Sequence, residues 1–267
     1  LPPMNLISLR KISGPTFWTL CGLLLAGTVL CLLGGTTIAS DRCLHFRCYW
    51  AVLAGGLALW ALRRKLRWVA LGAVGLVILH LWPVRQLWQP DPTVVTIAGP
   101  PATITLVSAN LYAHNRRQPE AVAQLLRLDG DVVFLMEVSP QWRQALQALF
   151  QKYPYQVGLG DTEWLLSRVP WQNAEATYLQ PEMLAPWADA IPWKTGMDWC
   201  DNTLVQADLV VQGKLIRVVG LHPGIPSNSA RLAQQLSQAK VYAAHLGAEP
   251  ARVLMGDFNT TEFSAVF

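Results

Sequence analysis

Hydrophobic and polar positions divide the chain into an N-terminal part with long apolar runs and a second part with shorter alternating segments. Phe17 to Gly35 is a run of roughly 19 residues without a charge, about the length that spans a bilayer as a helix. Tyr49 to Leu62 and Trp68 to Trp82 are weaker runs, each shorter than roughly 17 residues unless flanking residues are included. We therefore expect about three transmembrane helices. A cleaved signal peptide stays open for the first run, and a re-entrant or interfacial pair for the other two.

The positive charges near these runs predict the orientation in the membrane, because Lys and Arg at membrane ends stay on the cytoplasmic side. Arg10 and Lys11 precede the first run, and a cluster stands between the second and third runs: Arg63, Arg64, Lys65 and Arg67. The N-terminus is therefore expected inside, and everything after Trp82 outside the cytoplasm. Cys43 and Cys48 fall in a loop on the oxidising side, where a local disulfide and free thiols are both open.

Composition and charge support the same division. Hydrophobic residues make up 52% of the 267 residues and charged residues only 14%, against about a quarter charged in ordinary soluble domains. Residues 1–90 hold nine Lys or Arg and one acid (net +8), whereas residues 91–267 hold twelve and sixteen (net −4). We expect a membrane region over 1–90, then a proline-rich linker, then an outer domain over 91–267. The acidic outer domain lacks the basic surface that many nucleic-acid binders show.

The outer part alternates between strand-like and helix-like periodicity, which predicts an α/β domain. The expected strands are "ATITLVSAN", "DVVFLMEV", "KLIRVVGLH" and "ARVLMGD". The expected helices are "PEAVAQLLRL", ending at the turn Asp129-Gly130, then "QWRQALQALFQKY", capped by Ser139 with Pro140 in its first turn, and "SARLAQQLSQAKVYAAHLG".

Polar residues stand at the carboxyl ends of these strands or just beyond them: Asn110, Glu137, His222, Asp257 and Asn259. Strand ends of this kind meet at one rim of a sheet. Carboxylates there can hold a hard divalent cation, the cation can polarise a phosphoryl oxygen, and amide groups can hold the remaining phosphate oxygens. Each residue alone also fits a structural role as a buried acid, a turn former or a strand end. Their joint order favours a phosphoester-hydrolysing site.

Five segments in order, "VSANLY", "DVVFLMEVS", "LLSRVP", "VVGLHPGIP" and "VLMGDFNTT", resemble the endonuclease/exonuclease/phosphatase superfamily from about Ile104 to the end of the chain. This superfamily includes pancreatic deoxyribonuclease, abasic-site endonucleases, inositol-phosphate phosphatases and neutral sphingomyelinases. The resemblance implies an α/β fold, a four-layered α/β sandwich incomplete at its C-terminus and preceded by the α-helical transmembrane region. The N-terminal membrane segment makes the chain similar to bacterial members. Together with the apolar runs and the positions of Lys and Arg, this predicts a multi-pass protein of the bacterial inner membrane with an extracytoplasmic catalytic domain.

The resemblance also implies the roles of the strand-end residues and a magnesium ion, or manganese in its place. Glu137 matches the metal-ligating glutamate, and Asn110 matches the asparagine that supports the metal and phosphate site. His222 matches the histidine that contacts the scissile phosphate. Asp257 matches the aspartate that orients or deprotonates the attacking water, and Asn259 its phosphate-binding neighbour. Glu137 and Asn110 are thus the expected metal residues, and His222, Asp257 and Asn259 the expected catalytic residues.

Three features depart from the family pattern or match it less securely. Arg168 in "SRVP" matches a residue near the phosphate in some members only, and Tyr153 and Tyr155 do not resemble the family's catalytic tyrosine. The aspartate-histidine motif expected downstream of "GDFN" is missing, and Leu1 is not a methionine. We therefore expect a C-terminally truncated fragment that is poorly active.

Two function classes follow from these patterns. The first is a membrane-anchored, metal-dependent hydrolase acting on a nucleic acid, a phospholipid or a small phosphate ester, with the lipid bilayer as its other contact and no protein partner inferred. The second is a catalytically impaired membrane-tethered binding module or gene fragment. Trp187, Trp193 and Trp199 are expected either to pack on the sandwich or to form a lip at the membrane interface.

Overall fold

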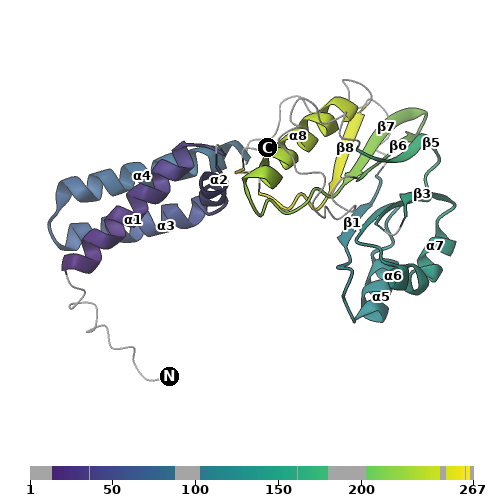
Figure 1. The fold of residues 1–267 in the computed structure, drawn as a ribbon, viewed down its shortest axis with the longest axis horizontal. Helices are drawn as coiled ribbons and strands as arrows, with labels where there is room; N and C mark the ends of the chain where they lie inside the picture. Colours follow the sequence, from purple (N-terminus) through teal and green to yellow (C-terminus); the bar gives the residue numbers. More distant parts are fainter. Residues whose placement is uncertain are drawn as a thin grey trace. The chain divides into compact units, whose positions relative to one another are not determined.

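The computed structural model describes residues 14–35, 37–87, 103–160, 162–179, 203–246, 251–261, 263 and 264, shown in Figure 1. The chain forms two compact units. One comprises residues 1–96, 261–265 and 267, and the other comprises residues 97–260 and 266. Trp187, Trp193 and Trp199 lie outside the described residues, so both expectations for these tryptophans stay predictions.

The first unit is helical where the sequence has its apolar runs. Its elements are α1 (Gly14–Leu32), α2 (Ile38–His45), α3 (Arg47–Arg63) and α4 (Arg67–Leu87). Helix α2 lies where the sequence predicted only a loop. It begins at a capping box, in which the Ser40 backbone N–H donates to Thr37 Oγ1 at 3.1 Å and the Thr37 backbone N–H donates to Ser40 Oγ at 3.0 Å. Cys43 and Cys48 are both free cysteines.

Small residues let the long helices of this unit approach closely. Ala54, Leu57 and Ala61 on α3 are buried against Phe17 and Leu24 of α1. A side chain added at Gly27 would meet the Trp50 ring at 2.7 Å, so the indole lies over the bare backbone of α1. Close backbone approach at small residues is typical of helices that pack in a membrane.

Two of the described helical segments, Gly14–Leu32 and Arg67–Arg85, are long and apolar enough to cross a membrane. This finding concerns length and composition, and helix α3 has 17 residues. Large apolar side chains cover the outer surface of all three long helices, including Trp18 (58% exposed), Val52 (76%) and Trp68 (84%). Contiguous apolar surface of this kind marks contact with a membrane or a partner in soluble and membrane proteins alike.

The second unit contains two four-stranded sheets. The first sheet has the order β1 (Leu106–Asn110), β2 (Val132–Met136), β4 (Glu163–Ser167), β3 (Tyr155–Leu159), and the second has β5 (Trp171–Tyr178), β6 (Thr203–Val211), β7 (Lys214–Leu221), β8 (Ala251–Gly256). Strands β1 and β2 are parallel and joined through α5 (Gln118–Leu128), and β7 and β8 are parallel and joined through α8 (Ser229–Leu246). The other neighbours in each sheet are antiparallel.

The buried residues define four layers, and Figure 1 shows the helices on the outer faces. Helices α5, α6 (Pro140–Ala145) and α7 (Gln147–Lys152) pack on one face of the first sheet around the buried Trp142 and Leu149. The two sheets face each other through Phe134 and Leu165 on one side and Leu209 on the other. Helix α8 packs on the outer face of the second sheet through Tyr242. This mixed α/β architecture of two sheets and helices confirms the expected fold class.

The structure differs from the sequence prediction in three respects in this unit. The single helix expected over residues 141–153 is broken at Leu146, which is fully buried and has φ −85° and ψ 4°. The break brings Trp142, Leu146 and Leu149 into one core, so tertiary packing overrides helical continuity. Ser139 makes no side-chain cap, because its hydroxyl donates to the Ala113 carbonyl at 3.5 Å. Strands β3 to β6 were not predicted at all.

Candidate active site

The direction of the strands brings the predicted site residues together. Asn110 is the last residue of β1, and Glu137 follows β2 directly. His222 follows β7, and Asp257 follows β8. Within each parallel pair the carboxyl ends lie at one edge. The two edges meet where the Asp257 backbone N–H donates to the Met136 sulfur at 3.1 Å.

The Asn110 side chain stands at the centre of these strand ends. Its Nδ2 donates to Glu137 Oε1 at 2.9 Å and to Asp257 Oδ2 at 3.1 Å, and it lies 3.5 Å from His222 Nε2. An amide nitrogen carries two protons, so one amide can serve both carboxylates. The structure therefore brings four of the predicted site residues, one from each of four strand ends, to one point.

A backbone N–H group helps to hold the Glu137 carboxylate in place. The Ala113 N–H, from the loop after β1, donates to Glu137 Oε2 at 2.9 Å. Glu137 itself has φ 58°, a left-handed conformation that is uncommon outside glycine and asparagine. Strained backbone of this kind concentrates at functional sites. The Glu137 side chain is only a quarter exposed. One of its carboxylate oxygens accepts from Asn110 and the other accepts from the loop after β1.

The turn after β8 is built by glycine and asparagine. Gly256 has φ 152°, and a Cβ there would lie 1.8 Å from the Leu221 carbonyl oxygen, so the backbone fits beside β7 only without a side chain. The Asn259 backbone N–H donates to Asp257 Oδ1 at 3.0 Å, and its side-chain amide donates to the Pro223 carbonyl at 2.9 Å. Asn259 is therefore adjacent to the cluster and orients Asp257, while its own amide is engaged with backbone.

A fifth residue, Glu163 at the start of β4, was missed by the sequence analysis. Glu163 is fully buried, its Oε2 accepts a hydrogen bond from the Thr203 hydroxyl, and its Oε1 lies 3.5 Å from His222 Nδ1. The imidazole thus stands between Glu163 on its Nδ1 side and the Asn110 cluster on its Nε2 side. An acid at the edge of the apolar run "WLL" was the available signal, of the same kind as Glu137 after "VVFLM".

Electrostatics favour a charged His222. Burial alone would lower the pKa of His222, but the hydrogen bond and the charge of Glu163, together with the charges of Glu137 and Asp257, outweigh burial and raise the pKa above its ordinary value. The imidazolium therefore persists to a higher pH than it does in an exposed histidine.

Arg168 is not brought to this cluster. Strand β4 runs antiparallel to β2 with Ser167 opposite Val132, so Arg168 lies at the far end of the sheet from Glu137. Its guanidinium lies 3.2 Å from Asp129 Oδ1 and 3.7 Å from Asp131 Oδ1. The predicted phosphate contact of Arg168 is thus replaced by an ion-pair network that joins β4 to the turn before β2. The sequence motif shows that Arg168 follows a strand, but it does not show whether that strand is parallel or antiparallel to β2.

The two tyrosines also lie away from the cluster. Tyr153 is buried, and its hydroxyl donates to the Gly130 carbonyl at 2.8 Å. The ring of Tyr155 lies with its centroid 5.8 Å from that of Trp171. Both contacts are structural, which agrees with the mismatch to the family's catalytic tyrosine.

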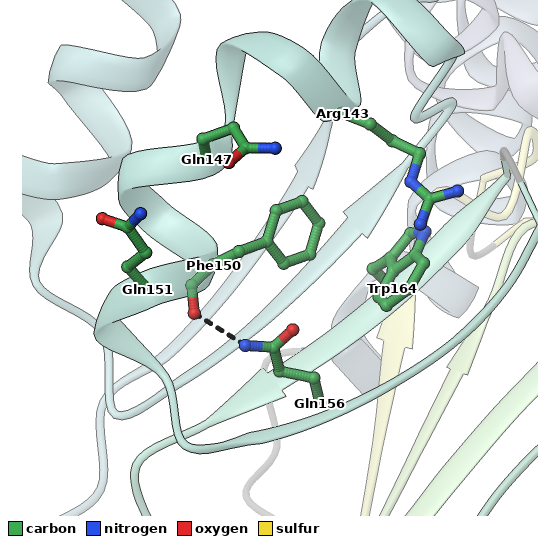
Figure 2. Close-up of a pocket in the computed structure, with 6 residues that line it drawn as sticks. All are labelled: Arg143, Gln147, Phe150, Gln151, Gln156 and Trp164. Atoms are coloured by element: carbon green, nitrogen blue, oxygen red, sulfur yellow. Dashed lines mark hydrogen bonds between the residues drawn. The ribbon is translucent and has the colours of Figure 1, made fainter.

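A separate pocket of about 340 Å³ lies on the helix-covered face of the first sheet, and Figure 2 shows its lining. The Arg143 guanidinium lies 5.0 Å from the Trp164 ring, and Phe150 packs edge-on against the same indole. Trp164 follows Glu163 in β4, and successive side chains of a strand point to opposite faces. The pocket is therefore on the other side of β4 from the Glu163–His222 pair.

The described residues fit a divalent cation with few protein ligands. No group of three or more His, Cys, Asp or Glu side chains that could hold a metal ion occurs in the part of the chain that the structure describes. Glu137 and Asp257 nevertheless approach the same amide nitrogen, and two carboxylates so close repel each other unless positive charge is shared. Mg²⁺ is commonly bound by one or two carboxylates, with water and substrate phosphate completing its shell.

Comparison with known proteins agrees with this geometry. The sequence model of the Endonuclease/Exonuclease/phosphatase family matches residues 107–267, and the chain belongs to this family. The expected resemblance is thereby confirmed. Members of the family hydrolyse phosphoesters and generally use divalent metal ions, which supports a hydrolase here. No curated protein sequence matches the chain.

The solved structures that are similar to the chain match about three fifths of it. Humanized D. rerio TDP2 with 14 mutations has a TM-score of 0.46 at 18% identity, covering 60% of this chain and 67% of that chain. D. rerio TDP2 in complex with a single strand DNA product has a TM-score of 0.46 at 18% identity, covering 60% and 62%. The mannosyl-6-phosphatase of Bacteroides thetaiotaomicron has a TM-score of 0.45 at 14% identity, covering 62% and 70%. The chain thus spans about two thirds of the length of these proteins.

Proposed function

We propose that the protein is a membrane-anchored phosphoesterase that depends on a divalent metal ion, Mg²⁺ or Mn²⁺. The observation that carries this proposal is the Asn110 amide, within 3.1 Å of one carboxylate from each sheet and beside His222. A binding module has no need of two converging acids, whereas a cation site at a phosphoester does. Glu137 is the residue that would hold the ion, and Asn110, whose Nδ2 donates to the Glu137 carboxylate, would support the metal site.

The ion, when bound, polarises the phosphoryl oxygen and offsets the charge that develops on it. Asp257 has one carboxylate oxygen fixed by the Asn259 N–H and the other facing the cluster, so it is placed to orient and deprotonate a water molecule. His222 presents Nε2 to the same point and, as a cation, donates to a phosphate oxygen. Asn259 acts by orienting Asp257 beside the phosphate.

Metal removal tests this function. We expect the protein, purified in detergent, to hydrolyse a phosphodiester or phosphomonoester with Mg²⁺, and EDTA to abolish hydrolysis until Mg²⁺ or Mn²⁺ is restored. The reason is that the cation would supply the positive charge that offsets the charge developing on the phosphoryl oxygen. Hydrolysis that is insensitive to EDTA would contradict the metal site, and binding of phosphoesters without turnover would indicate a tethered binding module.

Membrane anchoring rests on the helices of the first unit. We propose that α1, α3 and α4 all span, because each carries large exposed apolar side chains and α1 and α4 have the required length. The cationic turn between α3 and α4, with Arg63, Arg64 and Lys65, then lies in the cytoplasm. Residues 1–90 form the membrane region, and residues 91–267 form an extracytoplasmic catalytic domain, in the inner membrane if the source is bacterial.

Reporter fusions after residue 90 test the orientation. Alkaline phosphatase fused there is expected to be active and green fluorescent protein to be dark, because the fusion point lies outside the cytoplasm. Fusions after Lys65 are the matched control and should give the opposite pair of results. A fluorescent fusion after residue 90 would show that an even number of helices spans or that the orientation is inverted.

A further inference from the structure

The pocket on the helix-covered face of the first sheet has the residue types of a small-molecule site. Its volume is about 340 Å³. Figure 2 shows the side chains that line it: Arg143 of α6, Gln147, Phe150 and Gln151 of α7, Gln156 of β3 and Trp164 of β4. Small-molecule sites of this size combine apolar and aromatic surface with a few placed polar groups. The lining of this pocket provides both kinds of surface.

The aromatic floor of the pocket is held in one position. Trp164 pairs with Gly158 across β3 and β4, and a Cβ at Gly158 would lie 2.4 Å from Trp164 Cδ2, so the indole lies over bare backbone. The Trp164 Nε1–H donates to the Gly160 carbonyl at 3.2 Å. The Phe150 ring packs edge-on against the indole, with centroids 5.2 Å apart and planes at 77°. Both rings are only partly buried, so the pocket has a preformed apolar floor.

The charge of the pocket comes from Arg143. The guanidinium carbon of Arg143 lies 5.0 Å from the centroid of the Trp164 ring, a cation–π contact that holds the group against the floor. A guanidinium carries five N–H donors in its own plane, so stacking on a ring is compatible with bidentate hydrogen bonds to a carboxylate. Among the described residues that line the pocket there is no acid, and Arg143 is the one charged residue. The pocket therefore favours an anion.

Glutamine amides form the rest of the polar lining. Gln147 and Gln151 are exposed and stand four residues apart on α7, a spacing that places them on one face of the helix. The Gln156 amide nitrogen donates to the carbonyls of Phe150 at 2.6 Å and Tyr153 at 2.8 Å, which uses both of its protons. Figure 2 shows the Gln156 Oε1 turned toward the aromatic rings. Gln156 can thus bind a ligand as an acceptor, which requires a donor on the ligand.

We propose that this pocket binds a small organic monocarboxylate that has an apolar body and a hydroxyl group. The carboxylate pairs with the Arg143 guanidinium, the apolar body lies on the aromatic floor, and the hydroxyl donates to Gln156 Oε1. One guanidinium among neutral amides balances one negative charge, whereas a phosphate monoester carries about −1.5 to −2 at pH 7. Trp164 and Glu163 are successive residues of β4 and point to opposite faces, so the ligand does not meet the groups of the proposed active site.

Three probes with one skeleton test the chemistry of the ligand. They are 4-hydroxyphenylacetate, which has all three features, 4-hydroxyphenylacetamide, which lacks the charge, and phenylacetate, which lacks the hydroxyl. We expect isothermal titration of the detergent-purified protein in EDTA to show saturable binding of 4-hydroxyphenylacetate. Its Kd should be about tenfold lower than that of the amide, because hydrogen bonds to charged groups are the stronger ones. The Kd of phenylacetate should be about threefold higher than that of the hydroxylated acid.

Two variants of the pocket and one control locate the binding. Arg143→Gln should raise the Kd of 4-hydroxyphenylacetate about tenfold, to that of the amide. Gln147→Glu keeps the Arg143–Trp164 contact and adds a carboxylate four residues after Arg143, where it competes for the guanidinium, so we expect a similar rise. This second variant keeps the test decisive if Arg143→Gln loosens the floor. Arg127→Gln removes the same charge from an exposed arginine of α5 that donates to Gln124, and it should leave the Kd unchanged.

Several results would overturn the inference. They are an absence of saturable binding, an equal Kd for the acid and the amide, and an unchanged Kd in both pocket variants. An equal loss in Arg127→Gln would indicate a general effect of charge and also overturns it. Tighter binding of 4-hydroxybenzylphosphonate, abolished in Arg143→Gln, would assign the pocket to phosphoryl groups in place of carboxylates. Because each titration is read without turnover, the result is independent of whether the protein hydrolyses a phosphoester.

Discussion

Glu137→Gln is expected to lower kcat/KM for phosphoester hydrolysis by about a thousandfold. The change keeps the shape of the side chain and its hydrogen bond from the Ala113 N–H, but it removes the charge that faces the proposed cation. A metal ion contributes several kcal/mol to stabilisation of a phosphoryl transition state, and each 1.36 kcal/mol is about a factor of ten in rate. Initial rates over a range of Mg²⁺ concentrations check this prediction, and the Mg²⁺ requirement should rise with the loss of rate.

Glu175→Gln is the matched control for this change. Glu175 is an exposed acid on β5 that accepts a hydrogen bond from Gln206 at 3.2 Å, so its replacement removes the same charge at a position outside the Asn110 cluster. Hydrolysis by Glu175→Gln should stay within about twofold of the original rate. Retention of a tenth or more of the activity by Glu137→Gln would show that this carboxylate is not a metal ligand. A comparable loss in both variants would indicate a general effect of charge.

The convergence of four site residues was accessible from sequence because it depends on local patterns. Asn110, Glu137, His222 and Asp257 each end an apolar strand-like segment, and helices of adequate length separate the strands that prove to be parallel. Parallel strands joined by a helix bring their carboxyl ends to one edge of a sheet. What the sequence could not state is that one amide, that of Asn110, joins carboxylates from both sheets.

Glu163 and Arg168 show what local patterns leave out. Glu163 begins β4 and Arg168 follows it directly. This five-residue strand has no clear alternation, and its antiparallel pairing with β2 places Glu163 at the site end and Arg168 at the opposite end. The direction of a short strand is set by its partners across the sheet, which no local window contains. The break at Leu146 has the same origin, because the buried layer of Trp142 and Leu149 decides it.

The N-terminal helical unit gives the complementary case. The apolar runs predicted the long helices because apolar length is sufficient for a helix in lipid. Helix α2 was not predicted because it is a polar helix of only eight residues. The signal in its sequence is the capping box formed by two small residues, Thr37 and Ser40. His80 also escaped notice inside a run taken as apolar, although its Nε2 lies 3.0 Å from Thr28 Oγ1 and links α4 to α1.

Glu163→Gln is expected to lower kcat/KM by about a hundredfold near neutral pH, because proton donation by a positioned group contributes about that much to catalysis. Glutamine keeps an oxygen toward His222 Nδ1 and removes the charge, and its amide nitrogen takes the place of the oxygen that accepts from the Thr203 hydroxyl. The negative charge of Glu163 favours the imidazolium and raises the pKa of His222, so its removal lowers that pKa. The alkaline limb of the pH profile, where the cation is lost, should therefore move to lower pH in the variant.

The shape of that profile separates a positioning role from a purely structural one. Below both pKa values His222 is a cation in the original protein and in the variant, so the difference in kcat/KM should narrow as the pH falls. Thr203→Val removes only the hydroxyl that donates to Glu163 Oε2, and it should shift the same limb by a smaller amount. A uniform loss of activity at every pH in Glu163→Gln would mean that Glu163 supports the fold alone. In that case the charges of Glu137 and Asp257 would be what raises the pKa of His222. A metal ion held by the same carboxylates would then oppose the protonation of His222.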